Sequence, residues 1–203
     1  MRREEMGMRA RYVAAVALAG LWLMGAGTKA RADAGRVEAI LQKAAADIHI
    51  QIDRHWHKGE YNHIVNLSRA LISAQPKNVD LYANAAWLLW SMKRDDEAIA
   101  LYELGIRNNP DTYFLYDELA LYWADYRKQP AKALPYYEKS ASMKDAPAGT
   151  LHMLAHVYTK LGMLEKAKAT WEKAVAHPNN AMRAAAQRNL AKATEALKAK
   201  QRQ

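Results

Sequence analysis

An internal repeat constrains the fold of this chain more than any other feature of its sequence. Pro76 and Pro110 close successive periods of this repeat, and the same order of large and small apolar residues recurs around them. The recurring positions are Tyr82, Ala86, Leu89, Ala98 and Tyr102 in one unit, Tyr116, Ala120, Trp123, Ala133 and Tyr137 in the next, and Leu151, Ala155, Tyr158, Ala167 and Trp171 in a third. Within each unit the spacing is that of two amphipathic helices. One helical hairpin cannot bury its apolar face alone, so we expect the units to stack on one another.

This order of residues resembles the tetratricopeptide repeat, in which Leu-Gly and Tyr on a first helix precede Ala and an aromatic residue on a second helix, with a closing Pro. The small residues Ala86, Ala120 and Ala155 are expected to let paired helices approach closely. The resemblance implies an all-α fold, a solenoid of about four helical hairpins with a C-terminal capping helix. The predicted segments are a helical extension at 33–44, repeats at 45–78, 79–112, 113–147 and 148–180, and a capping helix with a basic tail at 181–203.

The third unit departs from the common spacing. Trp123 and Ala133 are ten residues apart, where the neighbouring units have nine. We expect the extra residue to lie in the turn at 126–131. The Gly that separates the two helices of a unit is present only at Gly59 and Gly162.

The two ends of the array follow the pattern less closely. The apolar spacing of residues 34–47 fits either one long first helix or a separate N-terminal helix. The last segment is expected to be an amphipathic helix, and its predicted inward residues are Met182, Ala186, Leu190, Ala193 and Leu197.

The segment at 1–32 has the pattern of a secretory signal peptide. Four Arg residues at positions 2–11 precede an apolar run at 13–24, and Ala30-Arg31-Ala32 is a small-x-small cleavage site. We predict cleavage after Ala32; a retained membrane anchor is the alternative. Cleavage would remove six basic and two acidic residues and lower the net charge from +9 to +5. We therefore expect an exported protein, periplasmic or secreted, that meets the membrane only through its transient signal sequence and does not bind nucleic acid.

The sequence contains no catalytic motif that we could identify. Cys is absent, which excludes disulfides, Cys nucleophiles and Cys-ligated metals. Gly-rich phosphate loops, Gly-x-Ser-x-Gly and His-Glu-x-x-His are absent as well. We expect a protein that is not an enzyme and uses no cofactor.

The resemblance also implies where a partner would bind, because in this family the first helices form the concave wall of the solenoid. Carried onto this chain, that geometry predicts a groove lined by His49, Asp53, Trp56, His57, Asp80, Trp87, Trp90, Phe114, Asp117, Leu121, Asp125, His152 and His156. An aromatic and acidic groove suits an extended peptide with apolar and basic side chains. The Lys/Asn/Arg set by which a familiar subgroup clamps a C-terminal carboxylate is missing, and Asp53, Asp117 and Asp125 would repel that group.

Trp87 and Trp90 are the strongest candidates for contact with a partner. They lie three residues apart and so share one helix face, and aromatic side chains with a polar rim are favoured anchors in interfaces. Either both rings face the groove, or one of them packs against the neighbouring second helix.

These features predict a non-catalytic scaffold or adaptor of the cell envelope that binds another protein or peptide. Two other classes stay open. A metal-binding protein for zinc or copper would use His49, Asp53 and His57, which are spaced i, i+4, i+8. A glycan-binding module would stack sugars on Trp87 and Trp90. A homo-oligomer also stays open, because stacked hairpins can continue across a two-fold axis.

Overall fold

The computed structural model describes residues 33–202 of the chain. The predicted signal peptide at 1–32 lies outside the described residues, as does Gln203. The described part of the chain consists of helices and the turns between them, with no strand. The chain divides into two compact units, Met1–Arg54 and His55–Gln203.

The N-terminal helix is continuous over residues 33–58. Of the two alternatives left by the sequence, the structure therefore has one long first helix. Most of its residues between 33 and 54 are exposed, including Val37, Ile40 and Leu41.

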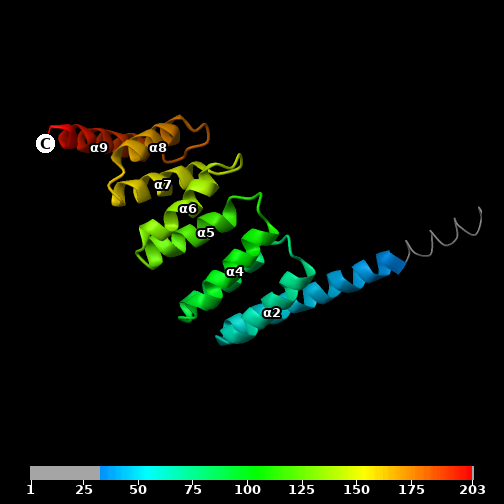
Figure 1. Cartoon of the computed structure of the whole chain (residues 1–203). Coiled ribbons are helices and arrows are strands. Elements are labelled where there is room, and N and C mark those ends of the chain that lie inside the picture. Colours follow the sequence, from blue (N-terminus) through cyan, green and yellow to red (C-terminus); the bar gives the residue numbers. More distant parts are fainter. Residues whose placement is uncertain (1–32, 203) are drawn as a thin grey trace, which may run out of the picture. The chain divides into compact units, whose positions relative to one another are not determined.

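The second unit is a stack of antiparallel helices that follow one another in sequence order (Figure 1). Its elements are α2 (Tyr61–Ala74), α3 (Val79–Ser91), α4 (Asp95–Asn108), α5 (Phe114–Leu121), the π-helical turn η1 (Tyr122–Tyr126), α6 (Pro130–Ala141), α7 (Ala148–Lys160), α8 (Leu164–Ala176) and α9 (Arg183–Gln201). Each helix packs against the next one. This arrangement is the all-α solenoid of helical hairpins that the repeat predicts.

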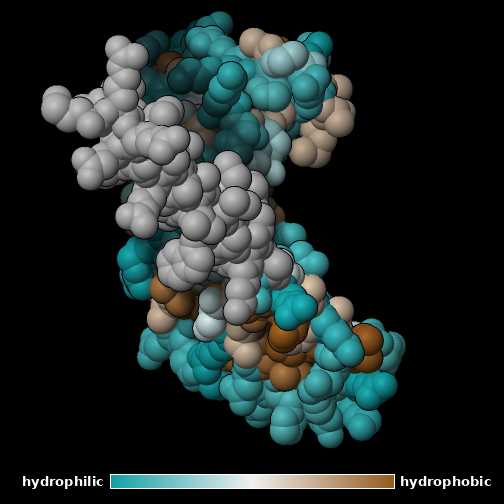
Figure 2. All heavy atoms as spheres, turned by 90° about the vertical axis from the view of Figure 1, so that its right-hand side faces the viewer, coloured by the Kyte–Doolittle hydropathy of each residue, from teal (hydrophilic) through white to brown (hydrophobic). Residues whose placement is uncertain are grey.

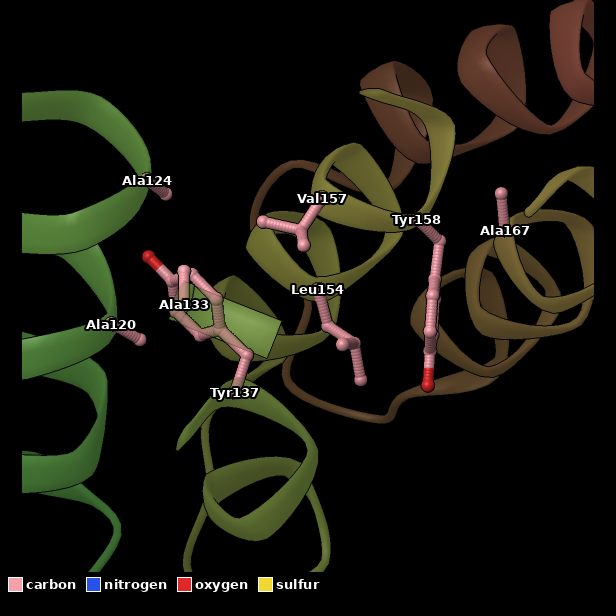
Figure 3. Close-up of a cluster of buried hydrophobic side chains, with 8 residues drawn as sticks. All are labelled: Ala120, Ala124, Ala133, Tyr137, Leu154, Val157, Tyr158 and Ala167. Atoms are coloured by element: carbon pink, nitrogen blue, oxygen red, sulfur yellow. The ribbon is translucent and has the colours of Figure 1, made fainter. Parts of the chain in front are cut away.

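Small residues at the helix contacts and large residues beside them build the core, as Figure 3 shows for the region around α6. Ala86, Ala120 and Ala155 have no exposed surface, which agrees with the close approach expected at these positions. In the cluster of Figure 3, Tyr137 and Tyr158 extend between helices whose facing positions are alanines. Large and small side chains thus interdigitate in the core.

Gly105 marks a contact with no room for a side chain. A Cβ atom built on this residue of α4 would lie 2.7 Å from Leu115 Cδ1 and 2.8 Å from Tyr82 Cγ. Both neighbours are fully buried. The Gly at this position therefore permits α4 to approach α3 and α5.

The turn between the two helices of each unit has a backbone position with positive φ. That position recurs once in every repeat and is occupied by Gly59 (φ 70°), Lys93 (65°), Lys128 (54°) and Gly162 (70°). All four units therefore share this backbone conformation at the turn, although only two of them have the Gly that tolerates it without strain.

The extra residue of the third unit is not in the turn, and that prediction was wrong. Lys128 and Ala133 are five residues apart, as are Lys93 and Ala98. The insertion lies earlier, where the end of the first helix widens into η1. One wider helical turn accommodates an inserted residue while the flanking helices keep their contacts.

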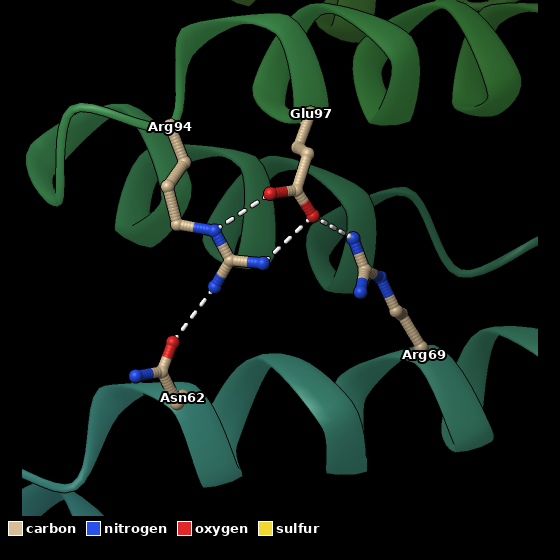
Figure 4. A network of polar contacts seen from close by, with 4 residues as sticks. All are labelled: Asn62, Arg69, Arg94 and Glu97. Atoms are coloured by element: carbon tan, nitrogen blue, oxygen red, sulfur yellow. Dashed lines mark hydrogen bonds and ion pairs between the residues drawn. The ribbon is translucent and has the colours of Figure 1, made fainter.

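An ion-pair network joins α2 to the start of α4 (Figure 4). Arg94 donates to both carboxylate oxygens of Glu97 at 2.7 Å, and Arg69 from α2 donates to the same carboxylate at 2.9 Å. These contacts, with Arg94 contributing most, lower the pKa of Glu97 to about 2. Arg94 also donates to Asn62 Oδ1 at 2.7 Å.

The C-terminal helix α9 packs against α8 through small residues. Ala186 and Ala193 are buried together with Trp171, and Leu190 packs against them. Met182 was predicted to face inward, but it is 53% exposed because it precedes the first turn of α9, which begins at Arg183.

Candidate partner-binding surface

Hydrophilic residues cover most of the described surface on the face drawn in Figure 2, with apolar residues gathered in its lower part. Eleven large apolar side chains are exposed among the described residues. Two of them are Trp56 and Trp87, which are 46% and 44% exposed. Their ring centroids lie 6.2 Å apart, within the range of favourable aromatic contacts.

Further aromatic rings extend this contact along the unit. Trp87 and Trp90 are 6.0 Å apart in an edge-to-face arrangement, and the Trp90 ring lies 4.1 Å from that of Tyr126. Trp56, Trp87, Trp90 and Tyr126 together form what we term the aromatic surface. Trp90 is half-buried and the other three are exposed. Of the two alternatives for the Trp pair, the structure shows one exposed ring and one that packs against its neighbours.

The π-helical turn η1 supplies Tyr126, which was not among the predicted groove residues. Tyr126 stacks on Tyr122 at 5.8 Å, and Tyr122 donates a hydrogen bond to Asp95 at 2.8 Å. Lys93 donates to the Tyr126 hydroxyl at 2.8 Å, which raises the pKa of Lys93. The longer third unit was the sequence signal for Tyr126, because the added residue lies in η1, which carries this side chain.

Three further predicted groove residues have varied environments. Leu121 is 42% exposed and lies one repeat after Trp87, at the equivalent place on its own first helix. Asp80 is exposed at the start of α3. Phe114 is half-buried and its ring contacts that of Tyr113.

Two of the acidic residues expected to line the groove are engaged by partners within the solenoid. Asp117 accepts hydrogen bonds from Ser140 Oγ and Thr150 Oγ1, both at 2.5 Å, so its carboxylate links α5 to α6 and α7. Burial raises the pKa of Asp117, and the two hydroxyl donors oppose that rise. Asp125 pairs with Lys160 at 3.2 Å. These two residues therefore act within the solenoid, and the repulsion of a carboxylate that we expected from them does not follow.

His152 is only 5% exposed, so it does not line an open groove as predicted. Asn180 donates to Ala174 O at 2.6 Å and accepts from the Met182 N–H at 2.9 Å, which fixes the orientation of its amide. The amide nitrogen also lies 3.1 Å from His152 Nε2, at hydrogen-bonding distance. His152 thereby holds the connection between α8 and α9.

His156 remains at the surface one helical turn further along α7. Its ring meets Trp171 edge-on at 4.8 Å, and His152 meets the same indole at 5.1 Å. Burial and the neighbouring His152 lower the pKa of His156.

The predicted histidine-rich residues fall in both units. His49 and Asp53 are exposed on the first unit, and His57 is exposed on the second. Within residues 33–202, no three His, Asp or Glu side chains are grouped so that they could hold a metal ion.

The part of the chain that the structure describes has no helix with the length and apolar character needed to cross a membrane.

Comparison with known families identifies the repeat. Residues 79–112 and 148–176 match the family described as tetratricopeptide repeat. These two matches coincide with stacked hairpins described above, which are therefore tetratricopeptide repeats. A comparison with curated protein sequences found no match.

Solved structures with the same fold include proteins of several kinds. A MamA protein superposes with a TM-score of 0.54 at 15% identity, over 76% of this chain and 88% of MamA. PilW, described as a type IV pilus biogenesis factor, gives 0.52 at 13% identity, over 75% and 76% of the two chains. TPR-like repeats of a putative kinesin light chain from Podosopora anserina give 0.53 at 20% identity, over 77% and 88%. At these identities the similarity is one of fold.

Proposed function

We propose that this chain is a non-catalytic protein-interaction scaffold that holds a segment of a partner protein against its aromatic surface. The observation that carries the proposal is the exposure of Trp56 and Trp87 in ring contact on successive first helices. Exposed aromatic patches on a hydrophilic protein mark interaction sites. Trp is also the residue type most enriched among those that dominate binding energy.

The solenoid holds this surface in place before a partner arrives. The half-buried Trp90 contacts both Trp87 and Tyr126, and Lys93 donates a hydrogen bond to the Tyr126 hydroxyl. A preformed surface limits the ordering cost of binding to the partner segment. The segment that fits best presents apolar side chains to the rings.

A capture experiment with the full chain tests this proposal. We expect that Trp56→Ala combined with Trp87→Ala reduces retention of a partner from an extract of the producing cells at least tenfold, because two large anchors are lost. The matched control is Leu104→Ala, an exposed apolar residue on the second helix α4. Circular dichroism should show equal helicity for all three proteins. Equal retention by the double variant and the control would contradict the proposal.

The proposed setting is the cell envelope, and residues 1–32 support it. Their basic, apolar and small-residue segments are arranged as in an exported precursor. PilW, which shares the fold, is described as a pilus biogenesis factor. Fractionation of producing cells, followed by intact-mass measurement, tests the setting: the expected species begins at Asp33 and is released with the periplasm or the medium. An uncleaved chain in the cytoplasm would contradict it.

A further inference from the structure

A pocket at the C-terminal end of the solenoid is separate from the aromatic surface. It has a volume of about 220 Å³ and lies between α7, α8 and α9. Its lining consists of His156, Thr159, Leu164, Trp171, Asn189, Lys192, Ala193 and Ala196. Pockets for drug-sized ligands are larger than this, so the space suits one large side chain.

The base and walls of the pocket are apolar. Trp171 is almost fully buried, and its indole is held in place by the edge contacts with His152 and His156. From α9 the apolar wall of the pocket receives the methyl groups of Ala193 and Ala196, whereas Asn189 and Lys192 of the same helix contribute polar side chains. Because α9 packs mainly against α8, these small residues leave open space towards α7.

Polar side chains with unused hydrogen-bonding capacity surround this apolar space. Within the described residues, His156, Asn189 and Lys192 form no hydrogen bond or ion pair. The lining contains no Asp or Glu. The acidic group that influences the pKa of His156 is Asp125, which is already paired with Lys160. The rim therefore offers an ammonium, an amide and an imidazole to a ligand.

We infer that this pocket binds a large apolar side chain of a partner protein that carries a carboxylate beside it. The apolar side chain would cover Trp171, and the carboxylate would accept hydrogen bonds from Lys192 and Asn189. Charge-assisted hydrogen bonds of this kind are stronger than those between neutral groups. The pocket can bind independently of the aromatic surface, since the two sites share no residue.

Small probes of defined chemistry test the pocket directly on the full chain. N-acetyl-phenylalanine presents both features and is expected to bind with a dissociation constant of about 1 mM, as befits so small a ligand. Binding should shift the NMR signals of the Trp171 indole and the His156 imidazole. N-acetyl-phenylalanine amide lacks the carboxylate and is expected to bind about tenfold more weakly. If no carboxylate-bearing probe binds more tightly than this amide, the inference is overturned.

Two sources could supply the carboxylate, and a third probe separates them. N-acetyl-glutamyl-phenylalanine amide carries it on a side chain within the chain, whereas N-acetyl-phenylalanine carries it at the C-terminus. Binding of either probe in the Trp171 pocket supports the site, and the tighter one identifies the source. Inorganic phosphate at the same concentration should leave the Trp171 signal unchanged; if it competes equally, the rim binds anions only and the inference is wrong.

Substitutions with matched controls locate the binding. Lys192→Gln should weaken N-acetyl-phenylalanine binding about tenfold, whereas Lys198→Gln, on the same helix but outside the pocket, should not change it. Ala196→Leu fills the pocket and should abolish binding, whereas Ala199→Leu should not. Both alanines are exposed on α9, so neither change disturbs the core. Unchanged binding in Lys192→Gln and Ala196→Leu would overturn the inference.

Discussion

Gly105 shows how a single residue sets the spacing of two hairpins. Substituting it with Ala would improve helix propensity by up to about 1 kcal/mol, yet the new Cβ would lie within 2.8 Å of atoms in Tyr82 and Leu115. We therefore expect Gly105→Ala to lower the free energy of unfolding by about 1–3 kcal/mol, the usual range for overpacking.

Gly149 provides the matched control for that prediction. It lies in the first turn of α7, and a Cβ there would meet nothing within 4 Å. Gly149→Ala should leave stability unchanged or raise it by up to about 1 kcal/mol. Urea unfolding of both variants measures the difference. Equal midpoints would mean that α4 can shift without cost and that Gly105 is not a packing requirement.

His156 gives the protein a pH-dependent stability. Its pKa is lowered in the folded state, so the unfolded chain takes up a proton first as the pH falls. The folded state should thus lose stability between pH 7.5 and 5.5. We expect His156→Gln to lose less stability over this interval than the unsubstituted chain does. Thermal unfolding at the two pH values measures this, and identical losses in both proteins would contradict the assignment.

Some side chains on the predicted groove face lie inside the solenoid, for reasons that helix spacing does not reveal. The helix spacing placed Asp117 and His152 on first helices, and both residues do lie on first helices, α5 and α7. Their side chains are engaged by Ser140, Thr150 and Asn180, which come from later elements. Periodicity identifies a helix face, but it does not show which polar partner the next repeat supplies.

At the scale of whole elements, the turn between the two helices of a unit is the most regular feature. Lys128 adopts the left-handed conformation that Gly162 adopts one repeat later. That conformation costs a residue with a side chain about 1–2 kcal/mol. Gly avoids this cost, but it loses more conformational freedom on folding, which offsets part of its advantage. We expect Lys128→Gly to raise stability by about 0.5–1 kcal/mol.

The opposite substitution should have the opposite sign. Gly162→Ala should lower stability by about 1 kcal/mol, although its Cβ would meet no atom within 4 Å. Guanidinium unfolding of the two variants measures both effects. A gain of stability in Gly162→Ala would show that backbone conformation is not what distinguishes these positions.

The order of elements could be predicted from the sequence, but the position of the inserted residue could not. The ten-residue interval between Trp123 and Ala133 revealed that an insertion exists. Its position depends on whether a helix or a turn absorbs the extra residue at lower cost, and residue counts do not distinguish these outcomes. The structure places it in η1, next to the contact between Trp90 and Tyr126.

At the scale of the whole molecule, the repeat allowed the solenoid to be predicted from the sequence. The binding surface could be predicted only in part. Each repeat places a residue at the same position of its first helix, so the exposure of Trp87 and Leu121 follows from their register. The depth of Trp90 depends on Tyr126, and the C-terminal pocket depends on the small side chains of α9. Both features arise between elements, where a periodic pattern carries no information.

The most direct test of the central claim is site-specific photo-crosslinking in producing cells. A photoreactive amino acid replaces either Trp87 on the aromatic surface or Leu104 on α4, which is also exposed. We predict that position 87 crosslinks to a defined partner protein, and that Trp56→Ala in the same chain reduces the yield, whereas position 104 gives no such product. Crosslinks to the same partner from position 104 but not from position 87 would contradict the assignment of the aromatic surface.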